Sequence, residues 1–265
     1  MHASSLRHLS VLVLSASVAA CAADTTIPSD APGAVTFSVA SSPATVSAAS
    51  LSSTSLGTST SLVVGRGKDT LQLDSVNVVF SRVVLHRAGG TSCGDAGHDD
   101  SGDHDCAELK AGPILVSLPL TAGAQTVFSV SAPAGSYTGM KLWTHRPNRA
   151  DSGPNTQAFL AAHPDYEGTS IRVYGKFNGA AFTWRGDPEA EIEQTFTPPL
   201  AVTGTAGLSL TLKIDVATWF QSDTGALLNP ATTYYPQIAN AIKASFRAFE
   251  DKSHTGNDDH GTGRP

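Results

Sequence analysis

Apolar and polar residues alternate over several short stretches of this chain. The clearest stretch covers positions 208–216, where every second residue is apolar and the residues between them are Ser, Thr, Lys and Asp. Successive side chains of a β-strand point to opposite faces of a sheet, so this pattern predicts a strand with one buried face. Val35, Phe37 and Val39 alternate with small residues in the same way and predict an earlier strand.

Another stretch is apolar at both alternating sets of positions. Residues 76–86 are rich in β-branched side chains, which indicates a central strand that is buried on both faces. The segments 171–177 and 181–185 flank Asn178-Gly179, a dipeptide that tolerates positive φ at both turn positions and therefore predicts a hairpin. Further short strands are expected at 114–118, 126–130, 137–145 and 191–197, the last of them stopped by Pro198-Pro199.

The spacing of apolar residues changes near the C-terminus. From Ile238 to Phe249 they recur at helical spacing, with charged residues between them. This pattern predicts an amphipathic helix over 236–250, with Pro236 in its first turn, where the missing N–H costs nothing. Eight or more short strands and one late helix favour an all-β fold, namely an antiparallel β-sandwich with the helix covering one end or edge.

The sequence divides into four parts. Residues 1–20 are predicted to be a signal peptide, and residues 21–33 a polar, proline-containing tether. Residues 34–250 are predicted to form the sandwich domain, and residues 251–265 a disordered polar tail. Within the domain, residues 40–61 consist mostly of Ser, Thr, Ala and Leu. They fit either a flexible loop or a pair of weak edge strands.

A ten-residue motif carries a resemblance to known folds. Residues 133–142 (PAGSYTGMKL) resemble the turn and strand of transthyretin-like and carboxypeptidase-regulatory-like sandwiches. Together with the strand at 76–87, the motif is similar to a family of bacterial envelope lipoproteins to which no function is assigned. The segment 210–220 fits the C-terminal strand of that family. The resemblance implies a sandwich over about 34–220 and brings no catalytic residues with it.

The N-terminal residues have the features of an export signal. Arg7 precedes a short apolar run that ends in Val-Ala-Ala-Cys at 18–21, which resembles a bacterial lipobox. The run is too short to cross a bilayer, which takes about 20 residues. The resemblance implies cleavage before Cys21 and lipid on that cysteine; an ordinary secretory signal with a chance cysteine is the alternative. Ala22 in place of Asp favours the outer membrane, so we expect a lipid-anchored protein of the bacterial cell envelope.

The chain is acidic. Removal of residues 1–20 leaves 16 Lys and Arg against 23 Asp and Glu, a net charge of −7. An excess of negative charge argues against binding to nucleic acid and against electrostatic attraction to anionic lipid. Besides the membrane reached through the N-terminal lipid, the expected partner is an envelope protein or a small ligand.

Two cysteines enclose a segment rich in Asp and His. Because an exported pair of cysteines is normally oxidised, Cys93 and Cys106 are predicted to form a disulfide. Carboxylate oxygens suit Ca²⁺, and imidazole together with carboxylate suits Zn²⁺. The alternative is a solvated acidic loop, since Gly and Asp are common in exposed turns. The candidate metal ligands are His98, Asp99, Asp103, His104 and Asp105.

A second candidate site lies at the end of the strand predicted at 137–145. Trp143, His145 and Arg146 combine an aromatic ring with basic groups and could rim a binding surface, although a Trp over the edge of the core is the simpler interpretation. The Gly-x-Ser-x-Gly match at 90–94 runs into an acidic loop instead of a helix, which argues against a serine hydrolase. The sequence therefore predicts a non-enzymatic binding or structural module without a required cofactor; a divalent-metal-binding envelope protein is the alternative.

Overall fold

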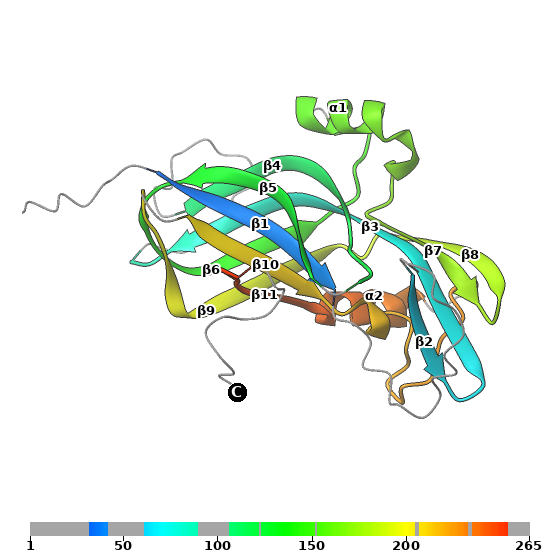
Figure 1. The fold of residues 1–265 in the computed structure, drawn as a ribbon. Helices are drawn as coiled ribbons and strands as arrows, with labels where there is room; N and C mark the ends of the chain where they lie inside the picture. Colours follow the sequence, from blue (N-terminus) through cyan, green and yellow to red (C-terminus); the bar gives the residue numbers. More distant parts are fainter. Residues whose placement is uncertain are drawn as a thin grey trace, which may run out of the picture.

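The strands of this protein form two packed sheets, with few helices beside them (Figure 1). The structure, a computed structural model, describes residues 32–41, 61–89, 106–121, 123–151, 153–204, 207–232 and 235–253, with the backbone alone at 106–112. The all-β sandwich predicted from the alternating pattern is confirmed.

The elements follow the predicted order, with additions. The strands are β1 (Gly33–Ser41), β2 (Leu62–Arg66), β3 (Asp69–Arg87), β4 (Cys106–Ser117), β5 (Ala124–Ala132), β6 (Gly135–Thr144), β7 (Ile171–Phe177), β8 (Ala180–Gly186), β9 (Ala190–Val202), β10 (Leu208–Ile214) and β11 (Phe246–Glu250). The helices are α1 (Pro154–Ala162) and α2 (Tyr235–Ala244), with 3-10 turns η2 (Pro164–Tyr166) and η3 (Val216–Thr218). Asn178 and Gly179 have φ of 50° and 82°, which confirms the predicted hairpin between β7 and β8.

The smaller sheet has four strands in the order β11-β10-β1-β5. β1 runs parallel to β10 and antiparallel to β5. Val35, Phe37 and Val39 are fully buried, which confirms the first predicted strand. The ring of Phe37 stacks on that of Phe128 in β5, with 5.0 Å between their centroids.

The larger sheet is organised around β3, which pairs with four other strands. Asn77 and Val78 pair with both β4 and β7, so these two strands flank β3 on opposite sides. Along one side of β3, β2 pairs with its first part and β4 with its second, while on the other side β7 pairs first and β6 after it. β8 lies outside β7, and β9 lies outside β6. Val78 and Val79 point to opposite faces and are both fully buried, which confirms the predicted central strand.

The main core lies between the two sheets. Phe80 of β3 meets Phe246 of β11 edge to face at 6.3 Å. Trp219 is fully buried, and its Nε1 donates to Ser245 Oγ at 2.8 Å. From α2, Ile238 adds a fully buried side chain to the same core.

A smaller apolar cluster lies on the other face of the large sheet. Val79 packs there with Phe159 and Leu160 of α1 and with Tyr166 of η2. The apolar pattern of the sequence does not predict α1, because only these two side chains of the nine-residue helix are buried. So short an apolar face leaves little helical periodicity to detect.

The predicted helix over 236–250 ends early. α2 stops at Ala244, and residues 246–250 form β11, which pairs antiparallel with β10. Phe246, Ala248 and Glu250 are buried while Arg247 is exposed, so this segment carries a two-residue period as well as a helical one. Pairing with β10 decides between the two patterns, because the small sheet has a strand edge at that position.

Two predictions about strand exposure and length also need correction. β9 continues through Pro198-Pro199 to Val202. Thr195 and Leu200 pair with β6, but the residues between them, including both prolines, have no partner in that ladder. The prolines therefore interrupt no cross-strand pair. In β10, Ser209 and Thr211 are buried although the alternation predicts an exposed face. The hydroxyl of Thr211 donates to Oδ2 of Asp251 at 3.0 Å, and Asp251 is itself fully buried.

The motif at 133–142 forms a turn that leads into β6. Tyr137 is fully buried, and its hydroxyl donates to the Pro133 carbonyl at 2.7 Å. Burial raises the pKa of this phenol. Arg87 closes the turn by donating to the Ala134 carbonyl at 2.7 Å. Gly139 lies so close to β9 that a Cβ there would come 2.8 Å from the Gln194 carbonyl oxygen, which explains a glycine inside this strand.

Several predictions concern residues outside the described part of the chain. These are the signal peptide, the lipidation of Cys21, most of the tether and of 40–61, and the tail from 254 onward. Within the described residues, no helix combines the length and the hydropathy that a membrane crossing requires.

Candidate binding site

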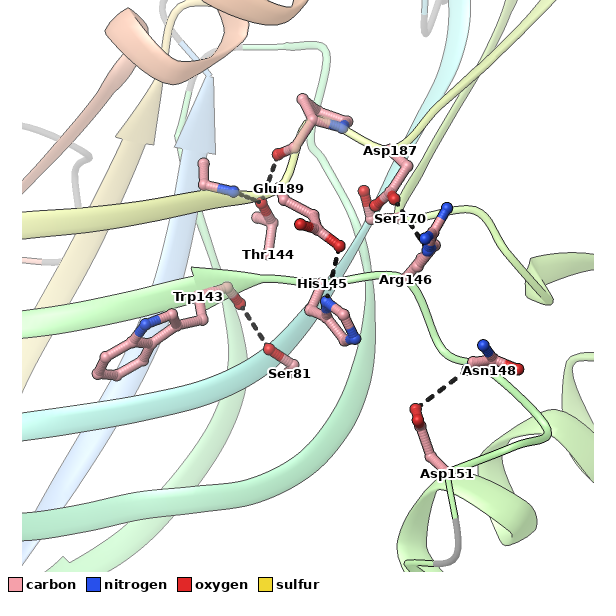
Figure 2. Close-up of polar contacts among 12 residues, drawn as sticks. Ser81, Trp143, Thr144, His145, Arg146, Asn148, Asp151, Ser170, Asp187 and Glu189 are labelled. Atoms are coloured by element: carbon pink, nitrogen blue, oxygen red, sulfur yellow. Dashed lines mark hydrogen bonds and ion pairs between the residues drawn. The ribbon is translucent and has the colours of Figure 1, made fainter. Parts of the chain in front are cut away.

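The end of β6 lies against the segment that leads into β9 (Figure 2). Thr144 is buried at this junction and pairs with Ala190 in the ladder. Its hydroxyl donates to the Pro188 carbonyl at 2.9 Å and accepts from the Ala190 N–H at 3.2 Å. These two hydrogen bonds fix residues 187–189 beside the residues that follow β6.

Two side-chain pairs, His145–Glu189 and Arg146–Asp187, connect the segments. His145 Nδ1 lies 3.2 Å from Glu189 Oε1, and both side chains are about half exposed. Arg146 Nε lies 3.3 Å from Asp187 Oδ2. The Asp187 side chain is only 15% exposed, so this second pair is partly removed from water. Figure 2 shows both pairs on the same side of the junction.

Asp187 is the most perturbed acid of this site. Its Oδ1 is buried and has no hydrogen bond of acceptable geometry to a described residue. Burial raises the pKa of the carboxyl and nearby Glu189 raises it further, while Arg146, Ser170 and His145 act in the opposite direction. A carboxylate held in this way is costly for the folded protein.

α2 supplies the other wall of the site. The Tyr235 hydroxyl accepts the backbone N–H of Asp187 at 2.9 Å. The Tyr235 ring stacks on Trp184 with 6.0 Å between centroids and leaves 40% of the residue exposed. The first turn of α2 is thereby joined to the segment that carries the acidic side chains.

Together these elements enclose an open depression of about 450 Å³. Its walls bring together Arg146, the segment 187–189 and α2, whose Lys243 is exposed at the rim. The depression offers cationic donors, carboxylate acceptors and one exposed aromatic ring. Such a mixture suits the recognition of a polar ligand or a charged peptide group.

The structure therefore separates the three residues predicted at this site. His145 and Arg146 come together with Glu189 and Asp187, and Arg146 lines the depression. Trp143 points away from them, and its ring lies under the Arg82 guanidinium at 5.3 Å. Neighbouring Lys141 holds Glu191 at 2.8 Å and Glu193 at 3.9 Å, so that this face of the sheet is a network of charges.

Sequence reasoning missed three residues of the depression. Asp187, Tyr235 and Lys243 lie 41 or more positions after Arg146 in the chain. Only the pairing of β6 with β9 and the packing of α2 bring them to it. No spacing in the sequence connects the segment around Asp187 to α2.

The predicted metal and disulfide residues lie mostly outside the described chain. Cys93, His98, Asp99, Asp103, His104 and Asp105 are among these. The backbone of Cys106 begins β4 and pairs with His86 of β3. In the parts of the chain with described side chains, no three His, Cys, Asp or Glu residues are grouped closely enough to hold a metal ion.

Comparison with known proteins yields one distant likeness. No family model matches this chain, and no curated protein matches it. Among solved structures, MbnP from Methylosinus trichosporium aligns with 80% of this chain and 86% of its own, at 12% identity and a TM-score of 0.33. A likeness at this level assigns the chain to no family.

Proposed function

We propose that this protein is a lipid-anchored envelope protein that acts as a non-enzymatic binding module. The depression between residues 187–189 and α2 is its binding surface. The observation that carries the proposal is the junction itself, where a His–Glu pair, an Arg–Asp ion pair and a stacked tyrosine lie around an open depression. Groups held in place before binding lose little conformational entropy when a ligand arrives.

The partner is a small polar ligand or an envelope protein that presents charged groups. Lys243 and Arg146 can donate to its carboxylate or phosphate, and Glu189 can accept from its ammonium or hydroxyl groups. Loss of one charge at such a surface mainly changes the association rate and the salt dependence of binding.

Photocrosslinking in intact cells tests the binding surface. A photoreactive amino acid replaces Lys243 in one variant and Lys68, an exposed residue of the β2–β3 turn, in a matched control. We expect an adduct from position 243 that weakens when Arg146→Ala and Glu189→Ala are added, and none from position 68. Equal adducts from both positions, or none from 243, would overturn the proposal.

Acyl labelling tests the membrane attachment separately. We expect radiolabelled palmitate to enter the wild-type chain and not Cys21→Ala. The variant should leave the membrane fraction while its folded domain stays intact. Label that persists in Cys21→Ala would remove the lipid anchor from the proposal and leave the binding surface untouched.

A divalent-cation-binding envelope protein is the second candidate. The segment between Cys93 and Cys106 holds five Asp and two His. The backbone of Cys106, which follows it, pairs with His86 in the β3–β4 ladder. Calorimetric titration of the full chain with Ca²⁺ and Zn²⁺, with His98→Ala and His104→Ala together as the comparison, tests this candidate. An absence of heat at micromolar metal would exclude it.

A further inference from the structure

Two cations face each other on the outer side of the small sheet. Lys213 of β10 and Arg247 of β11 are direct partners in the antiparallel ladder. Cross-strand partners have Cβ atoms about 5 Å apart, and like charges at such a pair destabilise a sheet. No carboxylate of the described chain lies within 4 Å of either cation. Asp215, two positions further along the chain than Lys213, is near enough for the Lys213 charge to oppose the rise that burial causes in the pKa of its carboxyl. Within the described chain, the fold therefore keeps two adjacent positive charges without an ion pair to either of them.

The position of the arginine is fixed. Arg247 Nη1 donates to the carbonyl of Ala244 at 3.1 Å and to that of Phe246 at 2.7 Å. These bonds attach the guanidinium to the C-terminal end of α2 and use only one of its three nitrogens. The rest of the planar group retains the geometry that binds oxyanions in a bidentate way.

The pair lies in a second depression, with a volume of about 570 Å³, lined by residues of β10, β11 and α2 and of the segment that follows β10. Figure 1 shows where these three elements lie in the fold. Ser222 and Ser245 contribute hydroxyl groups to the lining, and Asp215 and Asp223 contribute carboxylates. Ser222 Oγ accepts from the Ala226 N–H at 3.1 Å, so the loop opposite the cations is held by its own hydrogen bonds.

We propose that Lys213 and Arg247 bind a doubly charged oxyanion, namely inorganic phosphate or a phosphomonoester, in this depression. Two adjacent cations match two negative charges on one small group, and the fixed guanidinium matches its geometry. The carboxylates of Asp215, beside Lys213, and of Asp223, exposed at the rim, oppose binding and set its strength against the attraction of the pair. The site is distinct from the depression beside Arg146 and does not depend on the function proposed there.

The chain carries a built-in reporter for this site. Ser245 lines the depression and accepts the indole N–H of Trp219, one of three Trp residues in the protein. Each of the three indole N–H groups is expected to give one signal in an NMR spectrum of the full chain. Addition of phosphate at constant ionic strength is expected to shift the Trp219 signal in a saturable way and to leave that of Trp143 in place. Chloride serves as the comparison anion.

Three variants decide the outcome. Lys213→Gln is expected to weaken phosphate binding about tenfold, as loss of a charge-assisted hydrogen bond does. Asp223→Asn is expected to strengthen it, and Lys68→Gln, which removes an exposed charge elsewhere, to leave it unchanged. If Lys213 acted only on the stability of the sheet, Asp223→Asn would not strengthen phosphate binding.

A parallel titration distinguishes the source of the phosphate. Phosphatidylcholine vesicles that contain phosphatidic acid present the monoester on a membrane, whereas inorganic phosphate presents it in solution. A saturable shift with either one supports the proposal and identifies the source. No shift with both, a shift of equal size with chloride, or equal weakening by Lys213→Gln and Lys68→Gln would overturn it.

Discussion

The two ends of β6 are held by different kinds of contact. At its start, buried Tyr137 bonds to Pro133 within the same ten-residue motif, and Arg87 closes the turn from the neighbouring strand. At its end, His145 and Arg146 are exposed and pair with residues more than 40 positions later in the chain. The first end is specified by local sequence and holds the sheet together. The second is specified by topology and presents charge to solvent.

This difference predicts that substitutions lower the free energy of unfolding most at the start of β6 and least at its end. Changes at the buried end remove packing or force backbones apart, which costs several kcal/mol. Changes at the charged end alter one pair that water screens, His145–Glu189, and one that is partly buried, Arg146–Asp187. Four variants test this prediction, from the largest effect to the smallest.

Tyr137→Ala is expected to have the largest effect. Loss of a fully buried aromatic ring should lower the free energy of unfolding by about 4 kcal/mol. Tyr137→Phe keeps the ring and loses the bond to the Pro133 carbonyl, at a cost of about 1 kcal/mol. Urea unfolding measures both. Equal costs would mean that the hydrogen bond, and not the packing of the ring, holds this end of the strand.

Gly139→Ala is expected to cost about 2 kcal/mol, because the new methyl group meets the Gln194 carbonyl oxygen and the two strands must separate locally. Gly65→Ala in β2 is the matched control, since a Cβ there has no atom within 4 Å. Its stability should change by less than about 0.5 kcal/mol. Similar losses in both variants would show that glycine at 139 reflects strand flexibility and not the approach of β9.

Asp187→Asn tests the charged end through pH. The pKa of Asp187 is raised above its ordinary 3.8 in the folded state, mainly by burial. Below that ordinary value both states carry the proton and the carboxyl costs nothing; as pH rises through the raised pKa, the folded protein must bury a charge and loses stability. The amide that Asp187→Asn introduces does not ionise, so this variant does not lose stability in this way. The free energy of unfolding of Asp187→Asn relative to wild type is therefore expected to increase with pH.

The measurement for Asp187→Asn is urea unfolding at about pH 3 and about pH 7. Glu167→Gln, which removes a more exposed ion pair to Arg149, is the comparison. A relative stability of Asp187→Asn that decreases with pH would mean that the ion pair with Arg146 outweighs the burial of the carboxylate.

His145→Ala is expected to have the smallest effect, below about 0.5 kcal/mol, because both partners of the His145–Glu189 pair are half exposed. Thermal unfolding at low and high salt measures it. A loss above about 1 kcal/mol would make the pair a structural element and would end the contrast between the two ends of β6.

The sequence predicted the strands better than their limits. Alternation located β1 and β10, because the sandwich buries the apolar positions that the pattern marks. A stretch apolar at both sets of positions located β3, and the Asn178-Gly179 turn located β7 and β8. The apolar spacing predicted a helix through 246–250, but these residues fit both a helical and a two-residue period, and pairing with β10 makes them a strand.

The prolines at 198–199 predicted the end of β9 too early. Whether a strand can contain proline depends on how the neighbouring strand pairs with it, which the strand's own residues do not reveal.

The candidate site was only partly predictable for a related reason. His145 and Arg146 follow a strand, and their chemistry marked them as candidates. Their partners Asp187 and Glu189 belong to a different strand connection, and Tyr235 and Lys243 to a helix. Contacts between such segments depend on the order of strands in the sheet, which hydrophobic periodicity does not encode.

The position of β1 has a consequence for how the molecule assembles. β1 begins the described chain, yet it lies between β5 and β10, and it runs parallel to β10, which comes near the other end. A chain that emerges from its N-terminus therefore exposes this apolar strand long before one of its neighbours exists. Such distant pairing is slow to form, so the small sheet is expected to close last, and shortened chains that lack β10 are expected to aggregate through the uncovered edge of β1.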